Sequence, residues 1–281
     1  MDQKTWLITG CSSGLGRGIA LAALQSGGKV AVTARNPESL QHFVEQFSKQ
    51  ALPLRLDLND EESMKQAVEE TYRRFGSLDI LVNNAGHGYR AAIEESQPDQ
   101  VAELFQTNFF GPMELIQLVL PKMREARQGM IVNVSFIGAV RGALGNGYYS
   151  AAKGALELAT EALAKETQGF GIRTMLVEPG AFRTGFYEKR LAESTLKISD
   201  YDGLAAQYRK GAAPAFHDQL GDPERGGRVI VQTIFRKDAP FRLLLGSDAV
   251  NAARTTLENR LRELHAWEDV SRQSDFPKSE L

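Results

Sequence analysis

The chain has 281 residues, of which 42% are hydrophobic and 24% charged, proportions typical of a folded globular protein and not of a disordered one. Thirty-three Lys and Arg against 35 Asp and Glu give a net charge of −2, so no overall field favours nucleic acid or an anionic membrane surface. The single cysteine, Cys11, excludes an internal disulfide and fits a reducing compartment, and no apolar run is long enough to span a membrane. We therefore expect a cytoplasmic protein.

Short apolar runs alternate with longer amphipathic stretches. The amphipathic stretches predict helices, for example over Gly14–Gln25, Glu61–Phe75 and Tyr149–Thr167. The apolar runs are rich in Val, Ile and Leu, which is typical of strands buried on both faces; they are Trp6–Thr9, Lys29–Thr33, Leu52–Leu56, Asp79–Val82, Met130–Val134, Ile172–Val177 and Phe241–Leu245. This alternation predicts βαβ units and an α/β fold with a parallel sheet. No linker or repeat divides residues 1–281, so we expect a single domain.

Two segments depart from this alternation of apolar and amphipathic runs. Phe182–Gln219 has no strand signal and predicts helical segments and loop, either a lid over the substrate site or a solvated insertion. Val270–Leu281 is polar and contains a proline, so we expect a frayed tail.

A glycine-rich loop follows the first predicted strand and opens a helix. Its glycines permit a tight turn and a close approach of the backbone to a pyrophosphate, and the helix N-terminus attracts phosphate. The spacing G-x-x-x-G-x-G differs from the common G-x-G-x-x-G fingerprint. The loop predicts a dinucleotide site formed by Gly10, Ser12, Ser13, Gly14, Leu15 and Gly16.

The end of the second predicted strand indicates which cofactor this site prefers. In NAD-binding proteins a carboxylate at this position holds the ribose 2′-hydroxyl. This chain has no carboxylate there and has Arg35 instead. A guanidinium suits a 2′-phosphate, which favours NADP(H). The alternative is an exposed arginine in a turn.

Tyr149 and Lys153 lie four residues apart, on one face of a predicted helix. A neighbouring ammonium lowers the pKa of a phenol, so that it exchanges a proton near neutral pH. Taken alone, such a pair is also common on solvated helices.

Five motifs in order resemble the short-chain dehydrogenase/reductase family: Thr9–Gly16, Asn83–Gly86, Asn108, Tyr149 with Lys153, and Pro179–Thr184. The resemblance implies a Rossmann fold, with a doubly wound seven-stranded sheet and helices on both faces, and hydride transfer between a nicotinamide and a carbonyl or alcohol. It also implies a homodimer or homotetramer.

The resemblance implies a role for each matching residue. Tyr149 would be the general acid/base, Lys153 would lower its pKa and bind the nicotinamide ribose, and Asn108 would anchor a proton-relay water. Further cofactor contacts would come from Asp57 and Leu58 at the adenine, from Asn83, Ala85 and Gly86 at the ribose, and from Pro179, Gly180 and Thr184 at the nicotinamide amide.

One position departs from the family pattern. The family places a serine thirteen residues before the tyrosine, where this chain has Phe136, and Ser135 stands one position early. Either a shifted loop lets Ser135 turn inward and serve as the third catalytic residue, or Phe136 has displaced the serine.

We therefore expect NADPH-dependent, reversible reduction of a small apolar ketone or aldehyde, with substrate contacts from Phe136, Tyr89, Phe186 and Tyr187. The alternatives are an NADP-binding sensor or regulatory protein with impaired catalysis, and an NAD-dependent secondary-alcohol dehydrogenase. The four histidines are scattered, so we expect no metal site.

Overall fold

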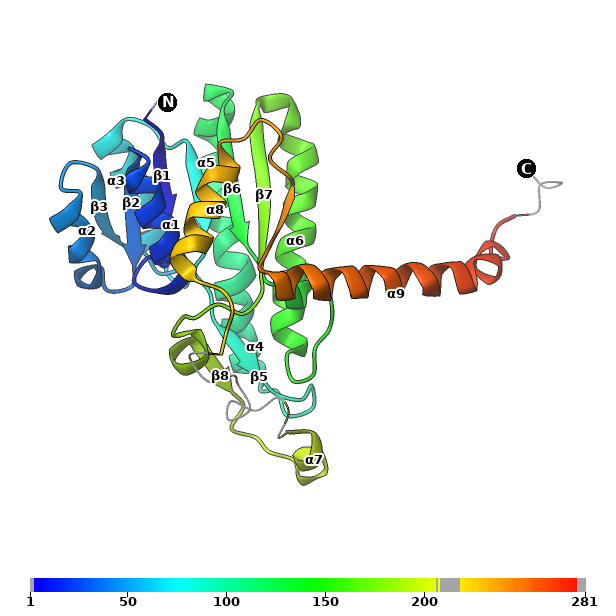
Figure 1. Cartoon of the computed structure of the whole chain (residues 1–281). Helices are drawn as coiled ribbons and strands as arrows, with labels where there is room; N and C mark the ends of the chain where they lie inside the picture. The colour runs from blue at the N-terminus through cyan, green and yellow to red at the C-terminus, as the bar shows by residue number, and fades with distance from the viewer. Residues whose placement is uncertain (1–2, 206, 208–217, 277–281) are drawn as a thin grey trace.

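A computed structural model describes residues 3–205, 207 and 218–276. Seven parallel strands form one sheet in the order β3-β2-β1-β4-β6-β7-β9 (Figure 1). They are β1 (Thr5–Ile8), β2 (Lys29–Ala34), β3 (Ala51–Arg55), β4 (Ile80–Asn83), β6 (Gly129–Val134), β7 (Ile172–Pro179) and β9 (Arg242–Leu245). Each matches one predicted run within a few residues, so the predicted α/β Rossmann-like fold is confirmed.

Helices cover both faces of the sheet because its strands are apolar on both sides. Trp6 and Ile8 point into one core with α1 (Gly14–Gln25) and α8 (Pro223–Ile234), where the backbones nearly touch at Gly18 and Gly227. Leu7 points the opposite way, into a core built with three other helices. These are α3 (Glu61–Phe75), α5 (Gly111–Ala126) and α6 (Gly147–Thr167).

Shorter elements complete the described part of the chain. Two helices are α2 (Gln41–Gln46) and α4 (Pro98–Phe105), and a π-helical turn over Gln106–Phe110 joins α4 to α5. A proline follows this turn, in the first turn of α5. Single 3₁₀ turns lie at Pro37–Leu40, Ile137–Ala139, Gln168–Phe170 and Ser199–Tyr201.

The predicted lid, residues 182–219, contains a strand that its sequence does not signal. After a π-helical turn at Phe186–Arg190, β8 (Leu191–Glu193) pairs in parallel with β5 (Gly88–Arg90) in a separate two-stranded sheet below the main one (Figure 1). The expectation of helix and loop alone was wrong here, because three residues are too few for a recognisable pattern and depend on pairing with a distant segment. The short helix α7 (Asp202–Ala205) follows, and residues 206 and 208–217 lie outside the described residues.

The last helix, α9 (Ser247–Arg272), extends away from the rest of the molecule (Figure 1). Only Ala249 and Ala253 in its first turns are buried. Residues 270–272, expected to be frayed, form its last turn, and residues 277–281 lie outside the described part. None of the described helices is both long and apolar enough to cross a membrane.

The sheet topology determines where a site forms. Successive strands run outward from β1 through β2 to β3, and then from β4 through β6 and β7 to β9 on its other side. The loops after β1 and β4 therefore diverge at the carboxyl edge, the point where open α/β sheets bind ligands.

Candidate functional site

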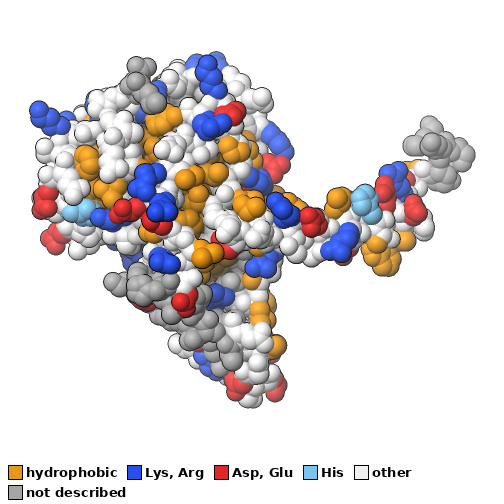
Figure 2. All heavy atoms as spheres, viewed as in Figure 1, with side chains coloured by type: hydrophobic (Ala, Val, Ile, Leu, Met, Phe, Trp, Pro, Cys, Tyr) orange, Lys and Arg blue, Asp and Glu red, His pale blue; other side chains and the backbone are white. Residues whose placement is uncertain are grey.

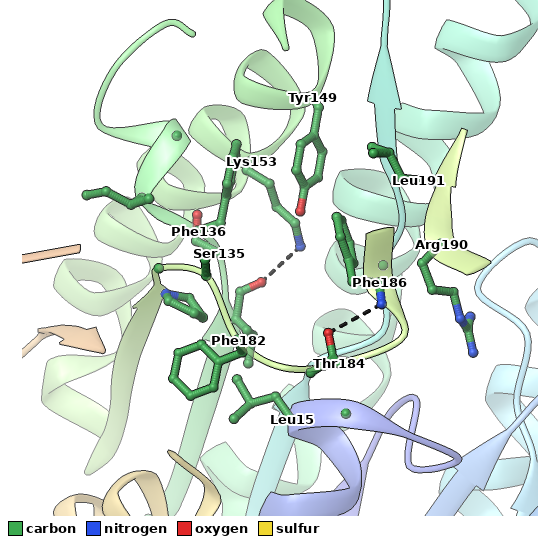
Figure 3. A pocket seen from close by; sticks show the side chains of 18 of the residues that line it. Leu15, Ser135, Phe136, Tyr149, Lys153, Phe182, Thr184, Phe186, Arg190 and Leu191 are labelled. Carbon is green, nitrogen blue, oxygen red and sulfur yellow. Dashed lines mark hydrogen bonds between the residues drawn. The ribbon is translucent and has the colours of Figure 1, made fainter. Parts of the chain in front are cut away.

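A cavity of about 360 Å³ opens at this edge, between the loops that follow β1, β4, β6 and β7 and the lid. It is lined by most of the residues singled out in the sequence: Gly10, Ser13, Gly14, Leu15, Gly16, Ala85, Gly86, Ser135, Phe136, Tyr149, Lys153, Pro179, Gly180, Thr184, Phe186 and Tyr187. Figure 3 shows side chains from the glycine loop, α6 and the lid converging on it.

The glycine loop leaves an open cradle beside the N-terminus of α1. Gly10 and Gly14 have φ values of 74° and 59°, in the left-handed region that favours glycine. A Cβ on Gly14 would lie 3.1 Å from the Thr184 side chain, and one on Gly16 would collide with Asn84. Backbone N–H groups at a helix start, kept clear of side chains, fit the phosphates of a dinucleotide.

Two arginines flank this loop. Arg35 is exposed just beyond β2, and Arg190 reaches from the lid to donate a long 3.5 Å hydrogen bond to Oγ of Ser12. Burial lowers the pKa of Arg190, and the nearby charge of Arg35 lowers it further. Neither Ser12 nor Arg35 lines the cavity itself; with Arg190 they form a cationic rim at the end nearest the glycine loop.

In the loop after β4, the asparagine that lines the cavity is Asn84 and not the expected Asn83. Asn83 is buried inside the sheet, where its Nδ2 donates to Oδ1 of Asn133 at 2.9 Å, and it does not line the cavity. Asn84 does, with its Nδ2 bonded to the Thr9 carbonyl at 2.9 Å. The expected ribose contact of Asn83 is thus not supported by its position, because its side chain ties β4 to β6.

The expected adenine contacts also lie outside the cavity. Leu58 is buried in the core, while Asp57 accepts a hydrogen bond from the Asn59 backbone at 3.1 Å. Pro179, the last residue of β7, and Gly180, the residue after it, line the cavity. There Asp248 accepts a 2.7 Å hydrogen bond from the Ala181 backbone.

Tyr149 and Lys153 lie on the first turns of α6 and point into the cavity together (Figure 3). The Lys153 Nζ donates to the Val134 carbonyl at 2.9 Å. Burial lowers the pKa of Lys153 to about 8, although Glu157, one turn further along α6, opposes the shift.

The pKa of Tyr149 does not follow the expectation. Burial raises it above the ordinary value, Tyr187 raises it further, and Arg90 is the group that lowers it. The cost of burying the phenolate therefore outweighs the lowering expected from a neighbouring cation. Tyr149 is therefore held protonated at neutral pH, which suits a proton donor.

Asn108 lies in the π-helical turn between α4 and α5, an irregularity common at functional sites. Its Nδ2 donates to the carbonyls of His87 and Leu104, at 3.0 and 2.9 Å. Its Oδ1 is buried without a hydrogen-bond partner among the described residues. A Cβ on Gly86 would lie 2.6 Å from this oxygen and 3.4 Å from Nζ of Lys153, so both face the space beside Gly86.

Aromatic rings line the part of the cavity around Tyr149. Phe136 stacks on Tyr149 with ring centroids 4.3 Å apart, and Phe186 lies 6.1 Å from Tyr149 on the lid side. Phe186 in turn contacts Tyr187 edge-on. Tyr89 is not part of this lining, since it is buried behind Tyr149 and donates its hydroxyl to Gln100 at 2.9 Å.

Comparison with known proteins identifies the family. Residues 4–194 match the family model described as short chain dehydrogenase. The chain belongs to the short-chain dehydrogenase family. The oxidoreductase BOA17 of Botryotinia fuckeliana is 33% identical over 269 residues, 95% of this chain and 98% of that protein. A 3-ketodihydrosphingosine reductase of Bacteroides thetaiotaomicron is 37% identical over 249 residues, 88% of this chain and 89% of that one.

A crystal structure of a short-chain dehydrogenase from Streptomyces avermitilis is similar throughout. It has a TM-score of 0.89 and 38% identity, and the match covers 98% of this chain and 100% of that one. The protein is therefore an oxidoreductase of the short-chain dehydrogenase family.

One of the two alternatives required Ser135 to turn towards Tyr149, and in the structure it does not. The Ser135 backbone N–H continues the ladder to the Val177 carbonyl at 2.8 Å, so the strand has not bulged. Its hydroxyl donates to Oε1 of Glu157 at 2.6 Å. Since successive residues of an extended strand point to opposite faces, Phe136 instead packs on Tyr149.

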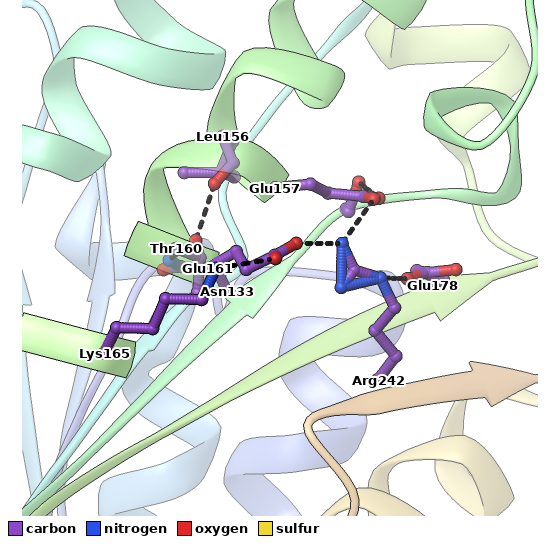
Figure 4. A network of polar contacts seen from close by, with 9 residues as sticks. Asn133, Leu156, Glu157, Thr160, Glu161, Lys165, Glu178 and Arg242 are labelled. Atoms are coloured by element: carbon purple, nitrogen blue, oxygen red, sulfur yellow. Dashed lines mark hydrogen bonds and ion pairs between the residues drawn. The ribbon is translucent and has the colours of Figure 1, made fainter. Parts of the chain in front are cut away.

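The partner of Ser135 belongs to a charged cluster that is buried at Glu157 and Glu178 and reaches the surface at Arg242 and Glu161 (Figure 4). Nη2 of Arg242 lies 4.0 Å from Glu157 and 3.3 Å from Glu161, and its Nε lies 3.5 Å from Glu178. Burial raises the pKa of Glu157, while the Ser135 hydrogen bond and Arg242 lower it. Ser135 is thus committed to this cluster.

Sequence reasoning missed three cations of the cavity, Arg90, Arg141 and Arg190. Arg190 lay in the expected lid without a motif to distinguish it. Arg90 follows Asn83–Gly86 by four residues, and only the pairing of β5 with β8 brings it into the cavity wall.

Proposed function

We propose that the protein catalyses NADPH-dependent reduction of a ketone or aldehyde to an alcohol, and the reverse reaction. The observation that carries this proposal is one cavity with the glycine cradle at one end and the buried Tyr149–Lys153 pair at the other. NADPH bound along this cavity would supply the hydride.

The chain's own residues would then handle the proton and the charge. Tyr149, protonated at neutral pH, donates its proton to the carbonyl oxygen as negative charge builds up there. Lys153 places an ammonium beside it, and the unpaired Oδ1 of Asn108 supports a water site behind Lys153. Gly10, Gly14 and Gly16 leave room for the pyrophosphate.

The cofactor preference rests on the cationic rim. Arg35 and Arg190 supply two guanidinium groups for a 2′-phosphate, a group that NAD lacks, and the Ser12 hydroxyl bonded to Arg190 adds a donor. This arrangement favours NADPH over NADH, and hence the reductase over an NAD-dependent alcohol dehydrogenase.

The test is turnover of NADPH, and separately of NADH, with a panel of aromatic and aliphatic ketones and aldehydes. We expect oxidation of NADPH that depends on the carbonyl compound. Tight NADPH binding without turnover of any compound would contradict the proposal.

One observation favours a second function, an NADP-binding sensor with impaired catalysis. Phe136 occupies the family's serine position and stacks on Tyr149, so one expected oxyanion donor is absent. The same turnover measurement separates the two functions.

We also propose that the protein self-associates, as a homodimer or homotetramer, through α9. Hydrophobic side chains are exposed on this protruding helix (Figure 2). Leu257, Leu261, Leu264 and Trp267 are exposed at intervals of three or four residues, which places them in one stripe along the helix. Residues 254–262 carry three arginines and one glutamate, and residues 263–272 carry three acidic residues and one arginine. Antiparallel pairing with α9 of a second copy would cover the stripe and bring the opposite charges together.

A further inference from the structure

Arg90 is a cation in the cavity wall that forms no ion pair with any carboxylate of the described residues. It is the last residue of β5, and its Nε is buried with no hydrogen-bond partner among the described residues. Burial lowers the pKa of this guanidinium, and the groups that oppose the shift are the phenols of Tyr187 and Tyr149, not a carboxylate. A partly buried guanidinium whose Nε has no partner among the described residues is costly, so it points to an anion supplied from outside the chain.

The charges around the whole cavity support this conclusion. Its lining carries four cationic side chains, Arg90, Arg141, Lys153 and Arg190. Its described lining has one carboxylate, Asp248, whose Oδ2 already accepts the Ala181 N–H. The cavity therefore has an excess of positive charge.

The phosphates of the cofactor do not account for Arg90. Arg190 lies close enough to Arg35 to be affected by its charge, and it donates a hydrogen bond to Ser12 at the glycine loop. Arg90 acts instead on Tyr149 and Tyr187, at the end of the cavity where the carbonyl would be reduced. The two groups of cations thus serve different ends of the site.

We propose that the substrate is an oxo acid, a carbonyl compound that also carries a carboxylate, and that Arg90 binds this carboxylate beside Tyr149. The planar guanidinium donates two parallel hydrogen bonds to a carboxylate, a geometry that an ammonium does not reproduce. Phe136, Phe186 and Tyr187 surround the same space and favour an aromatic or aliphatic body. This inference rests on the proposed reductase function and narrows its substrate class.

The first experiment compares substrates of one shape that differ in charge. NADPH turnover is measured with 4-acetylbenzoate and 4-acetylbenzamide, and with benzoylformate and its amide. For at least one pair we expect kcat/KM to favour the acid by about 10- to 100-fold, the range of a single charge-assisted hydrogen bond. The acid-to-amide ratio should fall to about 1 in Arg90→Met and recover only in part in Arg90→Lys.

A matched control separates a specific contact from the general field of the cavity. Arg141→Met removes an exposed cation from the same wall and should leave the acid-to-amide ratio within about threefold of the wild type. An equal loss of preference in Arg141→Met and Arg90→Met, or no preference in the wild type, would overturn the role of Arg90.

A second measurement does not depend on turnover. Calorimetric titration of benzoate into the full-length protein saturated with NADP⁺ should show binding that is lost in Arg90→Met. Benzoate binding with no reduction of any carbonyl would refute the reductase and retain the carboxylate site. Reduction of neutral ketones with no Arg90-dependent benzoate binding would retain the reductase and refute the site.

Discussion

Replacing Phe136 by serine tests whether the phenyl ring holds the place of a catalytic donor. The ring stacks on Tyr149 at a centroid distance of 4.3 Å, so a serine here would put a hydroxyl on the same side of the reacting carbonyl. A positioned donor to a developing oxyanion is worth about 10²–10³-fold in rate. If the hydroxyl is placed about as well as the ring, kcat for a reducible ketone should rise at least about tenfold.

The same substitution costs stability, and a matched variant separates the two effects. Loss of the aromatic pair removes about 0.5–1.5 kcal/mol, and the half-buried ring adds roughly 1–2 kcal/mol of lost burial. The Tm should therefore fall by about 3–6 °C in a chain of this length. Phe136→Ala carries the same loss without the hydroxyl, so the ratio of kcat values for the two variants isolates the donor.

Ser135→Ala completes this experiment. Its hydroxyl is bonded to Glu157 at 2.6 Å, so we expect a loss of about 1.5–3 kcal/mol in unfolding free energy and less than a threefold change in kcat. The measurements are steady-state NADPH oxidation and thermal unfolding. A Phe136→Ser variant no faster than Phe136→Ala, together with near-complete loss of turnover in Ser135→Ala, would refute the reasoning and make Ser135 the donor.

Four further outcomes are expected. Tyr149→Phe should lower turnover by about 10²–10⁴-fold while NADPH still binds, as measured by cofactor fluorescence. Arg35→Ala should raise the KM for NADPH at least about tenfold more than the KM for NADH. Burial raises the pKa of Glu178 to about 7, so the stability of the wild type should fall as the pH rises towards 7. The Tm of Glu178→Gln minus the Tm of the wild type should therefore increase over that range and become constant above it. Introducing glutamate at both Leu261 and Leu264 should lower the molar mass seen by light scattering; an unchanged mass would exclude α9 as the interface.

The sheet and most of the cavity lining could be predicted because their signals are local. A strand buried on both faces is a continuous apolar run, and the glycine loop and the Tyr149–Lys153 pair are short motifs placed directly after or within such elements. At the carboxyl edge of a parallel sheet, loops far apart in sequence necessarily converge, so these motifs meet without further information.

What could not be predicted depends on contacts between distant segments. The three-residue strand β8 exists because it pairs with β5, and this pairing brings Arg90 into the wall. The alternation of a strand decides that Asn84 lines the cavity while Asn83 bonds to Asn133 inside the sheet. Burial raises the pKa of Tyr149, and burial is a property of the packed lid and helices.

The position of Arg90 also bears on the pH dependence of the reaction. In the protein alone, Arg90 is the group that lowers the pKa of Tyr149, against burial and Tyr187. A substrate carboxylate paired with Arg90 would cancel most of that influence, because the pair presents little net charge to the phenol. Tyr149 would then stay protonated to a higher pH in the complex with an oxo acid than in the complex with the matching amide. The pH above which reduction slows should therefore be higher for the acid than for the amide. Reduction and oxidation pass through the same transition state, so the pairing changes this pH profile and leaves the equilibrium between carbonyl and alcohol unchanged.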